Sequence, residues 1–307
     1  PIINEARAVS DAGNVAMMGW LIILLAPITV ALVVWRTPEK IAPEVEGEGF
    51  RLRDYGALIA RPAFARILLA DLCLALGPGW MSATYLFFFT DSRGFTTGQA
   101  SILLAIYILA GIVGAPLMGR LAIKISKHRA VMVATTCYSL TLISLIAIPQ
   151  GNLAVAAIPL VIAGIMASGF NVLTRAMTAD IADEIRLEKG KERSGLLYAI
   201  TTMTTKVAGA FSIGLTFLVL SQVGYNAGDG AANSAHAIRN LELVFLVGPV
   251  VFVMLGGACM IGYGLGAEQH AEIRRQLDER DALYDQTPIV ESVTVEASIA
   301  VPPSSKT

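Results

Sequence analysis

Residues 180–220 of the chain, DIADEIRLEKGKERSGLLYAITTMTTKVAGAFSIGLTFLVL, join a dense cluster of charges to a long apolar run. Nine of the first fourteen residues are charged, whereas the run that follows carries one charge, on Lys206. About 20 mostly apolar residues are enough for a helix to cross ~30 Å of hydrocarbon. The run therefore predicts a membrane-spanning helix, and the charged cluster predicts a solvated loop where the chain leaves the membrane.

The composition of the whole chain agrees with a membrane protein. Its 307 residues are 55% hydrophobic and 15% charged, with a mean hydropathy of +0.64, whereas soluble domains have roughly 25% charged residues. The net charge of −1 shows no basic excess that would favour nucleic acid as a partner. Cys73, Cys137 and Cys259 lie inside apolar runs without ligand-like spacing, so we expect buried thiols rather than disulfides or metal ligands.

Seven segments are long and apolar enough to span a membrane. Residues 36–65 contain several prolines and glycines and predict a solvated linker that ends in a short amphipathic helix at 50–61. Residues 267–307 predict a polar tail that is helix-prone at its start and disordered at its end. The seven predicted spans are residues 15–35, 66–90, 99–121, 130–149, 153–178, 195–222 and 241–266.

The distribution of Lys and Arg predicts the orientation of these spans. Eighteen of the 23 Lys and Arg residues fall in four segments that lie on the same side of an alternating seven-helix path. We expect that side, which includes the C-terminus, to be cytoplasmic, and residues 1–14 to form an extracytoplasmic loop. The four basic segments are residues 36–66, 120–129, 179–194 and 267–307.

Lys206 is the residue of the apolar run with the clearest functional implication. It lies near the middle of the span, where a cation costs at least ~2.5–3.5 kcal/mol on insertion scales, so we expect it to face a wet cavity or a partner. Tyr198, Thr202 and Lys206 are spaced i, i+4, i+8 on one helical face, with Thr201 and Thr205 beside them. This polar face suits a ligand that forms hydrogen bonds. The alternative is a structural lysine, with threonines that tie helices together.

Asp71 and Arg175 lie near the predicted cytoplasmic ends of two spans. Their similar depth leads to the hypothesis of an ion pair near an inner gate. For Arg175, the alternative is that its long side chain snorkels to lipid headgroups. Asn171 lies one turn before Arg175 and adds a polar group on the same face, where we count it among the candidate substrate contacts.

Enzyme motifs are absent from the sequence, which has no HExxH, no GxSxG and no P-loop GxxxxGK[ST]. The histidines His128, His236 and His270 are scattered outside the predicted spans. We therefore expect no enzyme, no cofactor and no metal centre in this chain.

The stretch 179–225 resembles the signature of the glycoside–pentoside–hexuronide cation symporters, the melibiose-carrier branch of the major facilitator superfamily. The shared features are an aspartate pair, a charged run after a glycine, a Gly and a Tyr early in the next span, a midspan lysine and a closing Gly-Tyr. In this chain they are Asp180, Asp183, Gly190, Lys191, Arg193, Gly195, Tyr198, Lys206, Gly224 and Tyr225.

The resemblance implies twelve helices in two six-helix bundles, of which this all-α polytopic membrane protein would hold seven transmembrane helices. Residues 15–35 would be the last helix of the N-terminal bundle, 36–65 the cytoplasmic central loop and 66–266 the C-terminal bundle. The chain begins with Pro1 rather than Met, which agrees with a fragment. The missing N-terminal helices would then be a partner and would hold the site of the coupling ion, Na⁺ or H⁺. The expected location is a bacterial inner membrane.

The resemblance also implies roles for individual residues. Lys206 would lie in the substrate cavity, and Asp180 and Asp183, with Arg193, would make charge contacts that close a cytoplasmic gate against the missing half. Asn171 stands where the melibiose carrier has an aromatic residue, which argues against melibiose-like specificity. In the loop 119–129, Ile123 and Ser126 replace the usual Asp and Gly of a gating loop, so we expect a weaker gate interaction there.

These observations predict a secondary transporter that couples the uptake of a sugar or glycoside to a cation by alternating access. Another organic solute or an amphipathic lipid is the alternative within this class. A seven-helix receptor or membrane scaffold is the alternative from another class, and the midspan Lys206 without an evident midspan counter-ion argues against it.

Overall fold

The computed structural model of the chain describes residues 2–36, 52–190, 193–228 and 231–286. The chain divides into two compact units, Pro1–Glu46 and Gly47–Thr307. All the regular structure in the described residues is helical.

The first unit consists of a single helix, α1 (Ile2–Arg36). It is apolar on all sides from Trp20 onward, as expected of a helix surrounded by lipid or other membrane helices. The Arg36 guanidinium carbon lies 5.8 Å from the centroid of the Trp35 ring, and such a pair at the end of a span is typical of a membrane interface. Residues 2–14, which we expected to form a loop, belong to the helix, in which no proline occurs before Pro27.

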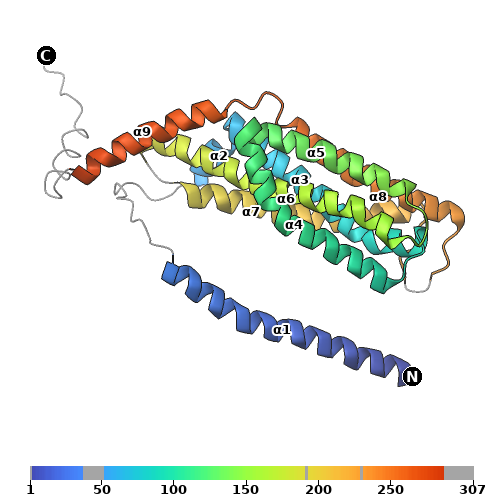
Figure 1. Ribbon diagram of the computed structural model, residues 1–307. Coiled ribbons are helices and arrows are strands. Elements are labelled where there is room, and N and C mark those ends of the chain that lie inside the picture. The colour runs from blue at the N-terminus through green and yellow to red at the C-terminus, as the bar shows by residue number, and fades with distance from the viewer. Residues whose placement is uncertain (1, 37–51, 191–192, 229–230, 287–307) are drawn as a thin grey trace, which may run out of the picture. The chain divides into compact units, whose positions relative to one another are not determined.

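The second unit contains six of the seven helices in the described residues that are long and apolar enough to cross a membrane. They run side by side along a shared direction (Figure 1). This confirms the predicted all-helical membrane fold. The six are α3 (Pro62–Phe87, continued by the π-helical turn η1, Phe88–Ser92), α4 (Thr97–Ile125), α5 (Lys127–Ser144), α6 (Leu153–Lys189), α7 (Ser194–Gln222) and α8 (Ala235–Ala258).

Side-chain caps define where several of these helices begin. Thr96 and Gln99 form a reciprocal capping box at the start of α4. Asn152 accepts a hydrogen bond from the Val155 N–H at the start of α6, and Ser234 accepts one from the Ala237 N–H at the start of α8. The Ser234 cap starts α8 before the predicted span 241–266, and the helix also ends earlier than predicted, at Ala258.

The C-terminal end of α6 differs from the prediction. The helix continues through most of the charged stretch, which we expected to be a loop, and ends at Lys189. This stretch consists largely of good helix formers and contains neither proline nor glycine before Gly190. Gly190 terminates the helix with φ +67°, a left-handed conformation that glycine adopts without a steric penalty.

α3 lies at the centre of the second unit, where it packs against α6, α7 and α8. The buried Phe88 and Phe245 rings stack with centroids 4.0 Å apart, and Trp80 Nε1 donates a hydrogen bond to the Val244 carbonyl. Gly248 of α8 lies under the Trp80 ring, where a Cβ would come within 2.6 Å of ring atoms. Close helix contact through glycine is a general feature of membrane helix packing.

α4 and α6 also approach closely through glycines. A Cβ at Gly114 of α4 would lie 2.6 Å from Ile165 Cα, and one at Gly164 of α6 would collide with the Tyr107 carbonyl. Because these neighbours are backbone atoms, they cannot rotate away. The two glycines therefore set the distance between α4 and α6.

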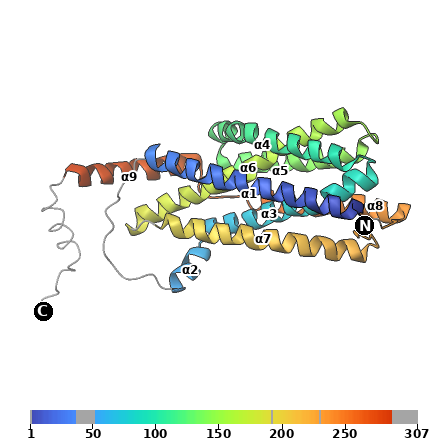
Figure 2. The same ribbon diagram turned by 90° about the horizontal axis from the view of Figure 1, so that it is seen from below.

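Two further helices are outside the membrane spans. The predicted amphipathic segment corresponds to α2 (Leu52–Ile59), and the helix-prone start of the tail corresponds to α9 (Ala267–Gln286). α9 runs alongside the C-terminal part of α6 (Figures 1 and 2) and buries Ile273 and Leu277. The rest of the predicted linker, residues 37–51, and the predicted disordered end, residues 287–307, lie outside the described residues.

Substitution of Gly114 by Ala should destabilise the fold by about 1–3 kcal/mol, the usual cost of overpacking. The added methyl group meets the α6 backbone and forces α4 and α6 apart. The measurement is the thermal unfolding midpoint of the protein in mild detergent. Gly98→Ala is the control in the same helix, because a Cβ there meets no atom within 4 Å; equal midpoints for the two variants would contradict the prediction.

Candidate functional site

α7 carries the predicted polar face. Because the helix is continuous from Ser194 to Gln222, Tyr198, Thr202 and Lys206 lie on successive turns of one side. Thr202 and Lys206 are exposed on the second unit, and Tyr198 is half-buried. Lys206 is thus an exposed cation near the middle of a helix that is long enough to cross the membrane.

Arg175 of α6 reaches across to this face. Its Nη1 donates a hydrogen bond of 3.1 Å to Thr202 Oγ1, and its guanidinium carbon lies 5.9 Å from the centroid of the Tyr198 ring. The Tyr198 hydroxyl in turn donates to the Arg175 carbonyl at 3.3 Å. Arg175 is therefore held against α7 and forms one polar patch with Thr202 and Lys206.

Asp71 does not form the ion pair that we predicted with Arg175. Its side chain is buried, and its two oxygens accept hydrogen bonds from Thr174 Oγ1 at 3.3 Å and Thr205 Oγ1 at 2.7 Å. Hydroxyl groups on the adjacent faces of α6 and α7 contact the carboxylate, and Arg175 donates to Thr202 instead. Asp71 therefore joins three helices through hydrogen bonds to threonine.

The other two predicted substrate contacts differ in accessibility. Thr201 is 2% exposed and donates to the carbonyls of Leu197 and Tyr198, so it faces the interior of the bundle in this conformation. Its position one residue before Thr202 turns it by about 100° around the helix. Asn171 is exposed one turn before Arg175, on the predicted side of α6.

Two residues of this cluster were not among the predicted site residues. Thr174 and Thr205 hold the Asp71 carboxylate. The sequence shows Thr205 one turn after Thr201, but the spacing does not reveal that α3 presents a carboxylate to it.

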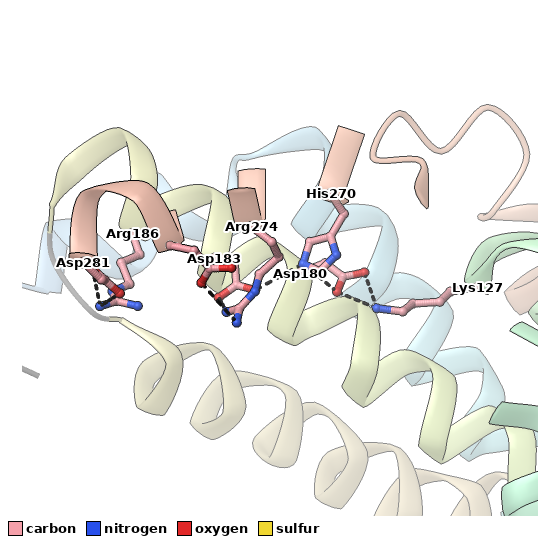
Figure 3. Close-up of polar contacts among 8 residues, drawn as sticks. Lys127, Asp180, Asp183, Arg186, His270, Arg274 and Asp281 are labelled. Atoms are coloured by element: carbon pink, nitrogen blue, oxygen red, sulfur yellow. Dashed lines mark hydrogen bonds and ion pairs between the residues drawn. The ribbon is translucent and has the colours of Figure 1, made fainter. Parts of the chain in front are cut away.

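A second polar cluster lies at the C-terminal end of α6 (Figure 3). Lys127 Nζ donates to both oxygens of Asp180, at 2.6 and 2.7 Å. His270 Nε2 lies 3.2 Å from Asp180 Oδ1 and 3.1 Å from Asp183 Oδ2, between the two carboxylates. Arg274 Nη1 lies 3.5 Å from Asp183. Residues of α5 and α9 thus surround the aspartate pair.

Further pairs extend this cluster along α9. Arg186 Nη2 lies 3.0 Å from Asp281 Oδ2, and Arg280 donates to the Arg186 carbonyl. On the exposed side of α9, hydrogen bonds from Arg275 and then Gln276 lower the pKa of Glu272 to about 2, so this carboxylate stays charged throughout the physiological pH range. Burial raises the pKa of Tyr263, which precedes α9, so its hydroxyl stays protonated.

This cluster gives the predicted gating aspartates partners of their own, and their contacts with the missing half stay a prediction. The resemblance implied that Asp180 and Asp183 need the missing half of the protein as their partner, whereas both carboxylates have partners inside the same unit. The partners on α9, His270 and Arg274, reach the two aspartates because the start of the predicted tail forms α9 and packs against α6. Arg193 is the N-cap residue of α7 and is half-buried; its role in gating stays a prediction.

A bundle of membrane-crossing helices with a cationic polar patch halfway along one of them is typical of a solute carrier. Sequence comparison leads to the same class. Residues 2–267 match the family described as MFS/sugar transport protein, and the chain belongs to this family of the major facilitator superfamily. Membership of a transporter family supports a carrier over the receptor, scaffold and enzyme alternatives.

Two curated relatives refine the comparison. The chain is 24% identical over 216 residues to the sodium-dependent lysophosphatidylcholine symporter 1-A of Danio rerio. The aligned residues make up 70% of this chain and 40% of the relative. It is 22% identical over 223 residues to the sodium-dependent lysophosphatidylcholine symporter 1 of Xenopus tropicalis. This alignment covers 72% of this chain and 42% of the relative. The chain thus spans about two fifths of the length of the curated relatives it matches. Their names do not point to the melibiose-carrier branch.

Substitution of Thr205 by Val should destabilise the protein by about 1.5–3 kcal/mol, the range for hydrogen bonds to charged groups. The loss leaves the buried Asp71 carboxylate with one hydroxyl partner fewer. A double-mutant cycle with Asp71→Asn, followed by thermal unfolding, checks the contact. The double mutant should lose less stability than the sum of the losses in the two single mutants. Strictly additive losses would count against the contact. Thr204→Val is the control, since that hydroxyl donates only to the Ile200 carbonyl.

Substitution of Asp180 by Asn should loosen α9, because Lys127 and His270 then lose a shared carboxylate. The exposed fraction of the Asp180 side chain is 8%, so we expect a loss larger than the ~0.2–1 kcal/mol typical of a surface pair. Limited proteolysis within residues 267–286 measures the release of α9. Asp278→Asn is the control, because that carboxylate is 71% exposed. Equal protection of α9 in both variants would refute the role assigned to Asp180.

Proposed function

We propose that the chain forms part of a sodium-coupled symporter whose substrate is an amphipathic solute with a phosphate-containing headgroup, such as a lysophospholipid. The observation that carries this proposal is the cationic patch formed by the exposed Lys206, near the middle of α7, and the half-buried Arg175 of α6. The names of the two relatives support the same substrate class and the choice of Na⁺ over H⁺.

The charges of the patch favour an anionic group over a neutral one. Lys206 has no carboxylate partner in the described part of the chain, and Arg175 donates to a neutral hydroxyl. The nearby Asp71 carboxylate accepts its hydrogen bonds from Thr174 and Thr205 and interacts with Arg175 only through space, so one carboxylate faces two cations. Two cations within a membrane are costly unless an anion offsets them. A phosphate oxygen accepts charge-assisted hydrogen bonds from both Lys and Arg.

The surface next to Lys206 suits the apolar part of such a solute. Met203 and Val207 form an i, i+4 pair beside Lys206, and their side chains are 70% and 42% exposed. An amphipathic solute would place its headgroup on the cations and its chain along these side chains. Rocking of two bundles around this patch would then expose it to each side of the membrane in turn.

A sugar or glycoside is the second candidate. The family description includes sugar transport, and Asn171 and Thr202 offer exposed hydrogen-bonding groups. In this candidate the melibiose-carrier branch would be the nearest family.

The site of the coupling ion is expected in helices outside this chain, and the bacterial inner membrane with a cytoplasmic C-terminus stays the predicted location.

Lys206→Ala in the natural full-length protein should lower sodium-dependent uptake by about tenfold to a hundredfold, because a charge-assisted hydrogen bond contributes about 1.5–3 kcal/mol. Uptake into proteoliposomes is measured for a lysophospholipid and for a panel of glycosides, with and without Na⁺. Lys206→Arg should retain part of the uptake, and Lys189→Ala, which removes an exposed lysine at the end of α6, should retain all of it.

The same assay separates the two candidates. Uptake of glycosides but not of lysophospholipid would favour the sugar carrier. Unchanged uptake of every solute by Lys206→Ala, at equal membrane expression, would remove Lys206 from the substrate site.

A further inference from the structure

The Asp71 carboxylate of α3 connects the two helices that carry the cationic patch. It accepts a hydrogen bond of 3.3 Å from Thr174 Oγ1 of α6 and one of 2.7 Å from Thr205 Oγ1 of α7. Thr174 immediately precedes Arg175, and Thr205 immediately precedes Lys206. On each of the two helices, the same carboxylate therefore binds the residue next to a cation of the proposed substrate site.

The threonines and the cations point in different directions from their helices. Consecutive residues are turned by about 100° around a helix. Thr174 is buried where it meets Asp71, which is itself buried, whereas Arg175 is half-buried and Lys206 is exposed. The contacts with Asp71 thus fix the rotation of α6 and α7 at the positions from which the two cations project.

The spacing between the two cations depends on α3. α7 packs mainly on α3 and only slightly on α6. The direct hydrogen bonds between α6 and α7 involve Tyr198 and Thr202, which lie on the turns of α7 before Lys206. In the part of α7 that the structure describes, the side-chain hydrogen bond to another helix that lies nearest to Lys206 is the one from Thr205 to Asp71.

Asp71 does not use the hydrogen-bond donors of the cations. Threonine hydroxyls contact both of its oxygens, and it interacts with Arg175 only through space. A direct ion pair would occupy donor groups that a phosphate needs. The carboxylate can therefore hold the two helices while the Lys206 ammonium stays free for an anion.

We propose that Asp71 is a positioning residue of the substrate site. Through Thr174 and Thr205, it holds Arg175 and Lys206 at a spacing and depth at which one phosphate group binds both. This inference rests on the proposed function, and Asp71 itself does not contact the solute. Because correct placement of binding groups is what makes them effective, loss of these contacts weakens binding of the headgroup and spares the transport of bound solute.

The test measures KM and the maximal rate of sodium-dependent lysophosphatidylcholine uptake by the natural full-length protein in proteoliposomes. Thr205→Val removes the hydroxyl at nearly constant volume. We expect KM to rise about tenfold, the equivalent of one hydrogen bond, and the maximal rate per folded molecule to be retained. Thr174→Val should raise KM by less, because its hydrogen bond is longer. Thr205→Ser keeps a hydroxyl and should restore KM.

The split between KM and the maximal rate separates positioning from stability. A merely structural contact would change the amount of folded protein, and hence the maximal rate, without changing KM. Thr216→Val is the control, because this buried hydroxyl of α7 donates within its own helix, and it should leave KM unchanged. If Thr205→Val does not fold, Thr174→Val, which removes the weaker contact, provides the same comparison.

A double-mutant cycle links the effect to the cation. In a Lys206→Ala background, Thr205→Val should raise KM much less than tenfold, because the group that it positions is gone. Unchanged KM in Thr205→Val and Thr174→Val, an equal rise in Thr216→Val, or a full rise in the Lys206→Ala background would overturn the inference. Unchanged KM in Lys206→Ala alone would instead overturn the proposed function.

Discussion

No water reaches the hydrocarbon core of a bilayer, so every polar group on a spanning helix needs a partner within the protein. Most hydroxyls of this chain meet the requirement locally, as Thr84, Thr178 and Thr216 do by donating to carbonyls one turn back. Asp71 cannot do so, and it draws α6 and α7 to α3 through Thr174 and Thr205. Two groups in the described spans depart from this rule: the buried Ser139 hydroxyl has no hydrogen-bond partner, and Lys206 is an exposed cation without a carboxylate partner. The constraint that explains the buried polar groups thus also identifies the candidate substrate contact.

At the C-terminal end of α6, water can solvate charged groups, so these groups do not need a partner within the protein. Exposed pairs such as Arg275 with Glu272 contribute little under these conditions. The pairs around Asp180 differ, since the carboxylate is nearly buried and has Lys127 and His270 as partners. A buried carboxylate that loses its partners is costly. We therefore expect Asp180, rather than the more numerous surface pairs, to decide whether α9 stays attached to α6.

The membrane spans could be predicted because hydropathy acts on each segment independently of the others. Their ends were less accurate. The charged stretch after residue 178 was expected to be a loop, although charge density excludes a segment from the hydrocarbon and not from a helix. α6 therefore extends to Lys189 beyond the apolar run. Residues 2–14 illustrate the same point, since the segment before the predicted span continues α1 as a helix.

The sequence by itself determined the all-helical membrane fold and the helical face shared by Tyr198, Thr202 and Lys206, because apolar length and helical spacing are properties of single segments. The resemblance of residues 179–225 pointed to the transporter superfamily. Only the tertiary structure decided which polar groups meet. Thr201 and Thr205 are equally close to the predicted stripe, yet Thr201 bonds within its own helix and Thr205 holds Asp71. Arg175 pairs with Thr202 rather than with Asp71, and Asp180 with Lys127 and His270. These contacts depend on how α3, α5, α6, α7 and α9 are rotated against one another, and packing at glycines such as Gly114 and Gly248 restricts that arrangement.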